Sequence, residues 1–423
     1  MNPDLSNKTV MWVDNGLFPA FLRRVAPAFK RAYYYSAWQA PFPSYKQTKL
    51  GEGYPEFERV NYPLLKADEV DLWVFADICY GDLQTFLAER GARVFGSRMG
   101  EEMEIDRAAF KELLKRVGLP VGPWELVKGT DALQKFLQGK ADTWWVKGRY
   151  GFSRRDMETW KWKGAHVSGD FLKEKIHDLG PFANDFEFVV EQELPDRVEI
   201  GYDGFVIDDK FPDHAMQAYE VKGVGMIGTV KAYGKLAEAV RQVNAALAPV
   251  FKQYGYRGAF ASEIRYGKDK KPFCIDPCCR FGSPSNELLQ ELFSGDDWAR
   301  AMWEGAEGRI YSPRPVAKYA TCLMVYAEES GRNWQPLEFP KGLDRWVKLR
   351  NPYRKGSRSY YVPQGEKGNL AGVVGVGETL EASIRAAEAH AEEVKGQLIE
   401  IGTEAIGKAR ETIEEGKKYG IEF

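Results

Sequence analysis

Short apolar runs alternate with amphipathic stretches over residues 8–97. Continuous apolar runs predict buried strands, whereas apolar positions three and four residues apart predict helices. Strands are expected at 9–13, 31–35, 72–76 and 92–95, and helices at 18–29 and 83–90. This alternation predicts a small parallel sheet with helices on its faces.

Ligands of such a sheet bind beyond the carboxyl ends of its strands. Two of these ends are expected at 14–16, which contains Asn15, and at 77–82. The region 36–62 is rich in proline, glycine and aromatic residues. We interpret this region either as a long functional loop or as core packing beneath a loop.

A helix is expected within residues 98–120. Its acidic residues come early and its basic residues come late, an order that suits the helix dipole, and Gly118-Leu119-Pro120 ends it. Beyond this helix, the strongest strands are expected at 143–147 and 186–191. Strands and helices therefore mix in the middle of the chain, as they do in α+β lobes.

The C-terminal part of the sequence changes character. Residues 316–378 carry many strand signals, and the chain from Leu380 onward is expected to be helical, with breaks at Gly402 and Gly407. These changes of pattern predict domains at 1–98, 99–315 and 316–423, with the middle domain split into lobes of about 121–193 and 194–315.

A hairpin in the second of these lobes gathers charged residues. Its strands are expected at 258–266 and 274–278, joined by the polar turn 267–271. This turn places Glu263 opposite Asp276, and alternation along the strand puts Asp276 and Cys278 on one face. With Arg280 just beyond, the two carboxylates can hold a divalent cation beside a phosphorylated ligand. The alternative is a surface hairpin whose charges face water.

Composition narrows the classes of function. The chain has 423 residues and a formal net charge of −2, which gives no general argument for nucleic-acid or membrane binding. Neither an apolar run of the ~20 residues that span a bilayer nor a secretory signal is expected. The five cysteines form no disulfide framework and the four histidines are scattered. A reducing, cytoplasmic location is therefore expected, with chemistry based on Asp, Glu, Lys and Arg.

Two stretches carry the residue types of a nucleotide site. Lys147 ends an apolar strand and precedes the loop 148–155, whose glycines and arginines can close over phosphates. The alternative is a basic hairpin tip. Glu191 ends the next strong strand, whose exit can present backbone groups to an adenine edge, with Glu199 near a ribose; the alternative is a domain hinge with solvated acids. The glycines of 223–228 permit close backbone approach, or simply form a turn.

The order of these features resembles that of the ATP-grasp ligases, and in particular the phosphoribosylamine–glycine ligase family. The resemblance covers nearly the whole chain and is carried by the stretches 70–120, 145–147, 189–191, 223–228, 276–284 and 372–382. It implies an α/β fold of the ATP-grasp type, with an N-terminal Rossmann-like domain and a small C-terminal α+β domain.

The resemblance also implies roles for the candidate residues. Arg107 and Lys147 would hold the phosphates of ATP, and Glu263 and Asp276 would bind Mg²⁺ or Mn²⁺. Arg280 would stabilise an acyl phosphate or its carboxylate precursor. The adenine pocket would be lined by Glu191, Gln192 and Leu194, with Glu199 near the ribose.

Three departures from the family's motifs lie where its substrates bind. The first loop carries Asn15 and has neither the arginine nor the histidine with which the family grips a phosphate. Cys278 replaces an asparagine, and a neutral thiol is a poor ligand for magnesium. Ser283 and Ser285 replace two acidic residues near the amine. An altered substrate is therefore expected, with candidate contacts at Asn15, Gly223, Gly225, Cys278 and Ser283.

The expected function is ATP-dependent joining of a carboxylate to an amine through an acyl phosphate, with ATP and Mg²⁺ (or Mn²⁺) as cofactors. The partners would be a small-molecule acid and a small-molecule amine, whereas neither nucleic acid nor a membrane is expected. Two alternatives stay open. The first is an authentic phosphoribosylamine–glycine ligase, and the second is a non-catalytic nucleotide-binding relative whose metal site is weakened by Cys278.

Overall fold

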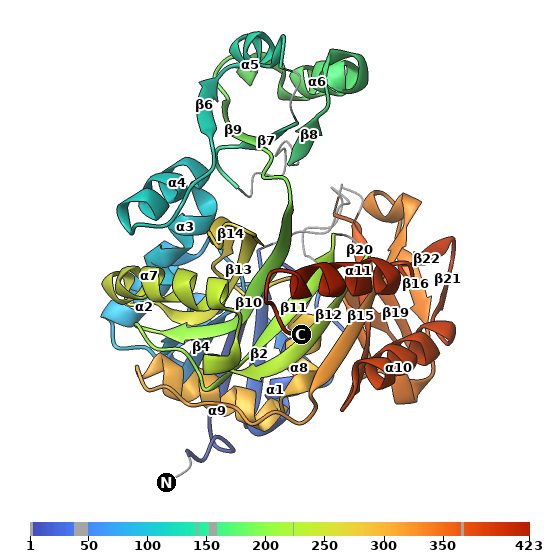
Figure 1. Ribbon diagram of the computed structural model, residues 1–423. Helices are drawn as coiled ribbons and strands as arrows, with labels where there is room; N and C mark the ends of the chain where they lie inside the picture. Colours follow the sequence, from blue (N-terminus) through green and yellow to red (C-terminus); the bar gives the residue numbers. More distant parts are fainter. Residues whose placement is uncertain (1–2, 38–49, 141–142, 152–158, 223, 365–367) are drawn as a thin grey trace.

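The computed structural model describes residues 3–37, 50–140, 143–151, 159–222, 224–364 and 368–423. Residues 38–49 of the predicted loop 36–62 lie outside this description. A small lobe (β6–β9 with α5 and α6) stands clear of the main body, and the C-terminal elements lie beside the body (Figure 1). Throughout the described ranges, no helix has both the length and the apolar character that crossing a membrane requires.

The N-terminal residues form the predicted parallel sheet. Its five strands lie in the order β3-β2-β1-β4-β5, and every neighbouring pair is parallel. The bounds are Thr9–Asp14 (β1), Arg31–Ser36 (β2), Glu58–Arg59 (β3), Leu72–Phe75 (β4) and Val94–Phe95 (β5). Helices α1 (Pro19–Val25) and α2 (Gly81–Glu89) follow β1 and β4. α1 ends earlier than predicted because Pro27 has no N–H to continue the helix.

The predicted helix within 98–120 is divided in two. α3 (Glu102–Ile105) ends at Asp106, whose backbone is extended, and α4 (Arg107–Arg116) begins directly after it. The Asp106 carboxylate accepts hydrogen bonds from two backbone N–H groups of α4 at 3.1 and 3.0 Å, so it caps this helix. The same carboxylate forms an ion pair of 2.8 Å with Arg149 of the small lobe. Asp106 thereby makes Arg107 the first residue of α4.

The small lobe has an antiparallel sheet and a core of its own. The strands lie in the order β6-β9-β7-β8. Their bounds are Trp124–Lys128 (β6), Trp144–Gly148 (β7), Trp160–Trp162 (β8) and Glu187–Gln192 (β9). Helices α5 (Thr130–Leu137) and α6 (Ala165–Leu179) lie on the side away from the body (Figure 1). Leu133, Val146 and Phe188 belong to the core of the lobe, so its apolar residues are buried without help from the body.

A nine-stranded sheet forms the centre of the body. Its strands lie in the order β14-β13-β10-β11-β12-β15-β20-β17, and β22 pairs with β15. The bounds are Arg197–Ile207 (β10), His214–Val221 (β11), Gly225–Ala232 (β12), Arg257–Gly267 (β13), Phe273–Cys278 (β14), Tyr319–Ala327 (β15), Val347–Leu349 (β17), Asn369–Gly377 (β20) and Ile399–Ile401 (β22). α7 (Glu238–Tyr254) connects β12 to β13. The sheet continues across residue 315, because β12 pairs with β15, and the domain bounds stay a prediction.

β13 and β14 form the predicted hairpin. Glu263 pairs with Asp276, as predicted, and Ala261 pairs with Cys278. On the other side of β13, Asp203 of β10 pairs with Ala261. Because side chains alternate along a strand, Asp203, Glu263, Asp276 and Cys278 all lie on one face of the sheet.

The C-terminal end departs from the prediction of an all-helical segment. Between α10 (Leu380–Glu392) and α11 (Ala405–Lys417), the chain forms the short strand β21 (Lys395–Gly396) and then β22. β21 joins β16 (Gln335–Glu338), β18 (Pro352–Lys355) and β19 (Arg358–Tyr361) in a four-stranded sheet. The prediction was wrong here because pairing with distant strands outweighs local propensity. Gly402 lies between β22 and α11, but Gly407 lies inside α11.

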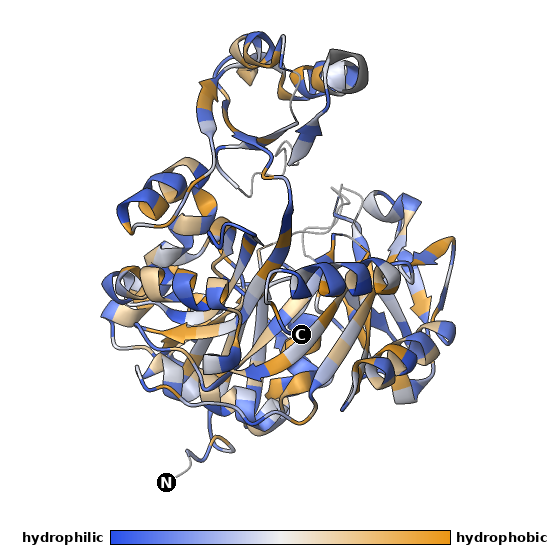
Figure 2. Cartoon of the chain, viewed as in Figure 1, coloured by the Kyte–Doolittle hydropathy of each residue, from blue (hydrophilic) through white to orange (hydrophobic). Residues whose placement is uncertain are grey.

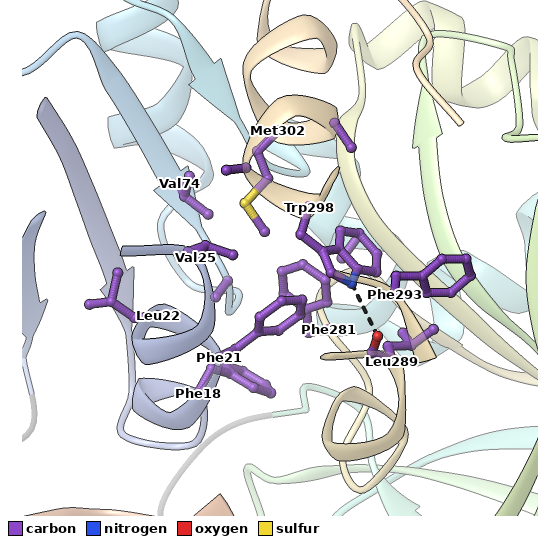
Figure 3. Packing of buried hydrophobic residues seen from close by; sticks show 14 of the residues in the cluster. Phe18, Phe21, Leu22, Val25, Val74, Phe281, Leu289, Phe293, Trp298 and Met302 are labelled. Carbon is purple, nitrogen blue, oxygen red and sulfur yellow. Dashed lines mark hydrogen bonds between the residues drawn. The ribbon is translucent and has the colours of Figure 1, made fainter. Parts of the chain in front are cut away.

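Hydrophobic residues are concentrated in the strands of the body, whereas α11 consists largely of hydrophilic residues (Figure 2). An aromatic cluster lies among α1, α8 (Ser285–Leu292) and α9 (Gly295–Ala306) (Figure 3). The Phe281 ring centroid is 4.8 Å from that of Phe21 and 5.8 Å from that of Trp298. Trp298 is itself fixed, because its Nε1 donates to the Leu289 carbonyl at 3.1 Å. Phe281 directly follows Arg280, so this core fixes the backbone that carries Arg280.

Candidate active site

A cavity of about 380 Å³ lies between the small lobe and the nine-stranded sheet, and we call it the lobe cavity. The predicted residues that line it are Lys147, Glu191, Gln192, Leu194, Glu199, Glu263 and Asp276. They come from β7, β9, the segment after β9, β10, β13 and β14. The fold therefore brings together, around one space, candidate residues that are far apart in the sequence. Trp145, Lys222 and Arg265 also line this cavity and were not predicted.

A second cavity of about 200 Å³ lies beside the first, over the face of the nine-stranded sheet, and we call it the sheet cavity. Glu199, Glu263 and Asp276 line both cavities, so these carboxylates form a wall between them. The other predicted residues that line the sheet cavity are Arg107, Cys278, Arg280 and Ser283. It is also lined by three acids that were not predicted: Glu104, Asp203 and Glu220.

The two predicted metal ligands belong to this wall. Burial raises the pKa of Glu263 to about 8, and the Lys222 ammonium, which hydrogen-bonds to it, acts in the opposite direction. Magnesium is usually bound by one or two carboxylates together with phosphate oxygens and water. Glu263 and Asp276 fit that pattern. Among the residues that the structure describes, no group of three or more His, Cys, Asp and Glu side chains could hold a metal by itself, so the ligand would have to supply further oxygens.

Lys147 at the end of β7 forms a buried ion pair with Glu191. The Lys147 Nζ lies 3.1 Å from one carboxylate oxygen, and the Lys111 Nζ lies 2.6 Å from the other. Burial alone would raise the pKa of Glu191, but the two ammonium groups hold it at about 2. The three groups together carry one excess positive charge. Lys111 was missed, although it lies one turn after Arg107 on the same side of α4.

Arg107 faces the other cavity. Its Nη1 donates to the Gly148 carbonyl at 2.8 Å, which joins the start of α4 to the end of β7. Arg107 lines the sheet cavity and Lys147 lines the lobe cavity, so the two predicted phosphate-binding residues lie on different sides of the carboxylate wall. Of the predicted phosphate loop 148–155, residues 152–155 lie outside the described residues.

Arg280 is held by two buried acids. Its Nε lies 3.0 Å from Glu104 Oε1 and 3.5 Å from Asp77 Oδ1. Glu104 also accepts a hydrogen bond from the backbone N–H of Cys279 at 2.6 Å. Burial opposes the charge, but the neighbouring anions raise the pKa of Arg280. Arg280 is therefore a fixed cation at the cavity. Neither acid was assigned a role from the sequence, although Asp77 lies at a strand end where a ligand was expected.

Two cations of the lobe cavity pair with two of the three carboxylates of the wall. Arg265 Nη2 lies 3.1 Å from Glu199 Oε2, and Lys222 binds Glu263. The side chains in both pairs are partly exposed to water. Exposed pairs of this kind contribute little free energy, so a bound ligand or ion can replace either cation at small cost.

The remaining candidate substrate residues have different outcomes. Asn15 lines neither of the two cavities, and its Oδ1 accepts a hydrogen bond from the Tyr80 hydroxyl at 2.9 Å. Gly225 lies in β12, where a Cβ atom would be 2.6 Å from the Cys322 carbonyl oxygen. Close packing against β15 therefore accounts for this glycine. Gly223 lies outside the described residues.

Cys278 lines the sheet cavity as a neutral thiol. Burial raises its pKa well above the usual value. Its Sγ donates to the Arg280 carbonyl at 3.8 Å. Because magnesium prefers oxygen ligands, the thiol adds nothing to a magnesium site formed by its neighbour Asp276.

Comparison with known proteins gives a likeness in structure. No family model matches this sequence, and no curated protein matches it. Phosphoribosylamine–glycine ligase from Thermotoga maritima matches with a TM-score of 0.70 and 18% identity over 93% of this chain and 99% of that chain. The biotin carboxylase domain of 2-oxoglutarate carboxylase from Hydrogenobacter thermophilus, solved with MgADP, ADP and bicarbonate, gives 0.64 and 13% over 94% and 92%. N5-carboxyaminoimidazole synthetase from Staphylococcus aureus, solved with ADP, gives 0.59 and 12% over 93% and 99%.

Identities at this level show a shared fold. The likeness extends over nearly the whole chain, including the N-terminal parallel sheet and the central antiparallel sheet. The chain therefore has the α/β fold of the ATP-grasp type that the resemblance implied.

Proposed function

We propose that the protein is an ATP-dependent carboxylate–amine ligase that works through an acyl phosphate. The lobe cavity carries this proposal, because residues expected to contact ATP come from separate parts of the sequence and line one space. Two solved structures with a similar fold contain MgADP or ADP, which supports a nucleotide as the ligand of this cavity.

ATP would lie in the lobe cavity with its adenine at the exit of β9. Gln192 and Leu194 would border the adenine, and Glu199 would reach the ribose after release from Arg265. Lys147 would contact the phosphates. Its charge stays available because Glu191 is shared with a second lysine.

The substrate carboxylate must become a better acyl donor, because its own leaving group would be oxide. One of its oxygens would attack the γ-phosphorus of ATP, and the bond to the bridging oxygen would break, which releases ADP. The amine nitrogen would then attack the acyl carbon. The carbon–oxygen bond to phosphate would break, phosphate would leave, and the proton of the amine would pass to solvent.

The wall between the cavities would be the place of phosphoryl transfer. Glu263 and Asp276 would hold Mg²⁺ or Mn²⁺, which when bound neutralises charge on the phosphates. Arg107 and Arg280 would face the transferred phosphoryl group from the sheet cavity. Fixed cations aimed at developing negative charge lower the barrier to such transfers.

Specific observations favour two alternative functions. A non-catalytic nucleotide-binding role is favoured by Cys278, which offers no oxygen to a metal, and by Lys222, which neutralises Glu263. An authentic phosphoribosylamine–glycine ligase is favoured by the TM-score of 0.70 to that enzyme.

ADP release with Mg²⁺, measured over carboxylic acids crossed with amines, tests the ligase function. ADP and phosphate should appear only with a matching pair, and the product mass should equal acid plus amine minus water. Asp276→Asn should abolish release. Asp209→Asn, the same change at a residue that lines neither cavity, should leave it unchanged.

Other results of these measurements distinguish the three candidate functions. ATP binding in calorimetry without ADP release from any pair would favour the non-catalytic role. Turnover of phosphoribosylamine with glycine would establish the family's standard reaction. Absence of ATP binding would overturn all three.

A further inference from the structure

Asp203 is a carboxylate of the sheet cavity that the ATP site does not use. It lies in the same cross-strand row as Cys278, with the small Ala261 between them. The next row along the sheet holds Glu263 and Asp276. Rows on one face are about 7 Å apart, because the side chains of that face repeat every two residues. Asp203 therefore lies just beyond the metal-ligand pair, on the side away from the lobe cavity.

The charge of Asp203 is not balanced by the protein. Its side chain is buried, with the residue only 6% exposed. The Ser285 hydroxyl is the group that favours its ionised form, and in the described part of the chain no lysine or arginine forms an ion pair with it. Burying a carboxylate without a counter-ion is costly. Three other acids around the cavity do have cations: Glu104 has Arg280, Glu199 has Arg265, and Glu263 has Lys222.

Space is kept open beside this carboxylate. A Cβ atom at Gly282 would lie 3.2 Å from Asp203 Oδ1 and would collide with the Ser285 hydroxyl. Glycine at this position therefore leaves the Asp203 carboxylate and the Ser285 hydroxyl side by side at the cavity. A carboxylate and a hydroxyl together can accept the hydrogen bonds of an ammonium group.

We propose that Asp203 binds the ammonium group of the amine substrate, which is a small cation without a phosphate group. This inference rests on the ligase function proposed above. An ammonium at Asp203 would supply the missing positive charge, and its nitrogen would lie about one row from Glu263 and Asp276, where the acyl phosphate forms. Glu220 adds a second carboxylate to the cavity. A phosphate on the amine would meet both acids as a like charge.

Two matched probes test the proposal: ethanolamine and O-phosphoethanolamine. Both carry the same ammonium group, and the second also carries a phosphate. Saturation-transfer NMR on the full chain, with and without MgADP, detects such weak ligands. Ethanolamine should bind the parent protein more tightly than O-phosphoethanolamine does. Asp203→Asn should weaken ethanolamine binding by about ten- to hundredfold, the loss expected for a hydrogen bond between charged groups.

Two controls separate binding from folding. Asp209→Asn makes the same chemical change outside both cavities and should leave binding unchanged. Asp203→Asn removes an unbalanced buried charge, so its melting temperature should be equal to that of the parent or higher. A purely structural role for Asp203 would lower the melting temperature instead.

Several results would overturn the inference. These are equal ethanolamine binding by the parent and by Asp203→Asn, tighter binding of O-phosphoethanolamine, or no ethanolamine binding by the parent. ATP binding is measured on the same samples. If the parent protein binds ethanolamine through Asp203 but does not bind ATP, the result would count against the ligase function and would leave the ammonium site in place.

Discussion

The two cavities differ in how their charges are balanced. In the lobe cavity, Glu191 is held between two lysines, and Glu199 is paired with Arg265. In the sheet cavity, Arg280 is neutralised by buried acids, whereas Asp203 has only a hydroxyl beside it. A ligand entering the lobe cavity can exchange places with cations already present. In the sheet cavity, no cation among the described residues balances the negative charge of Asp203, so a positively charged ligand is favoured there.

The two cavities also differ in how closely their residues follow the ATP-grasp motifs. The lobe cavity is lined by most of the residues expected from the ATP-grasp motifs, although Arg107 and Arg280 line the sheet cavity. The sheet cavity contains Cys278 and Ser283, two of the departures from those motifs. One fold can host many substrates because the residues around its cavities vary. Four substitutions and one change of pH test this difference between the cavities.

Glu191→Gln should have the largest effect, on stability. It leaves Lys111 and Lys147 buried together without an anion, and breaking a buried pair in this way costs about 3–5 kcal/mol. Urea denaturation measures the change. Glu187→Gln on the same strand removes a partner of Arg149 in a partly exposed pair and should cost less than about 1 kcal/mol. Equal stability of the two variants would show that the buried ion pairs of Glu191 contribute no more than the partly exposed pair of Glu187.

Acid should weaken the same ion pairs. The pKa of Glu191 is about 2 in the folded protein, against about 4.3 for an unperturbed glutamate. A lowered folded pKa contributes stability that is complete above about pH 4.3 and is lost as the pH falls toward 2. Urea midpoints between pH 6 and pH 3 should therefore fall less steeply for Glu191→Gln than for the parent. Parallel curves would contradict this linkage.

Lys147→Met should weaken ATP binding by about ten- to hundredfold, because a hydrogen bond to a charged group contributes about 1.5–3 kcal/mol. Calorimetry measures the affinity. Lys173→Met makes the same change on α6, where the lysine side chain is 76% exposed, and should bind ATP like the parent. ATP binding that is unaffected by Lys147→Met would exclude the lobe cavity as the phosphate site.

Cys278→Asn should lower the Mg²⁺ concentration needed for half-maximal ADP release. The substitution offers an amide oxygen beside Asp276, and we expect a shift of about tenfold, equivalent to about 1.4 kcal/mol. Cys79→Asn replaces an exposed thiol and serves as the control. An unchanged Mg²⁺ requirement would show that the thiol does not limit metal binding.

Arg265→Leu should have the smallest effect. Its pair with Glu199 is partly exposed, so stability should change by less than about 1 kcal/mol. Release of Glu199 should change ATP affinity by less than about fivefold. A large loss of ATP binding would give Arg265 a direct contact with the nucleotide, and the lobe cavity would then contain a cation that does more than neutralise the wall.

Local sequence signals were sufficient where a short segment determines the geometry. The polar turn 267–271 sets the register of β13 and β14, so the pairing of Glu263 with Asp276 followed from the sequence. The parallel strands β1, β2, β4 and β5 followed from their apolar runs, whereas the two-residue strand β3 lies in the predicted loop 36–62 and was missed. The division between α3 and α4 did not, because the helical pattern continues through Asp106 while its side chain caps the second helix.

Partners that meet only in three dimensions left no local signal. Lys111 binds a carboxylate on another lobe, and Glu104 binds Arg280 from a separate helix. Asp203 was hidden for a different reason. Asp-Gly is a dipeptide typical of turns, yet Asp203 and Gly204 lie inside the long strand β10. The sequence therefore offered the residues proposed to bind ATP as motifs and gave no sign of Asp203, the carboxylate proposed to bind the amine.

The cap at Asp106 also lies where the small lobe is attached to the body. Asp106 binds Arg149 of the small lobe at 2.8 Å, and Lys111, further along α4, binds Glu191 of the lobe at 2.6 Å. A rotation of the lobe that left α4 in place would separate both pairs. α4 itself packs into the core of the body through Phe110 and Leu113, so the two ion pairs tie the lobe to the body. Opening the lobe cavity by such a rotation would therefore require both pairs to break.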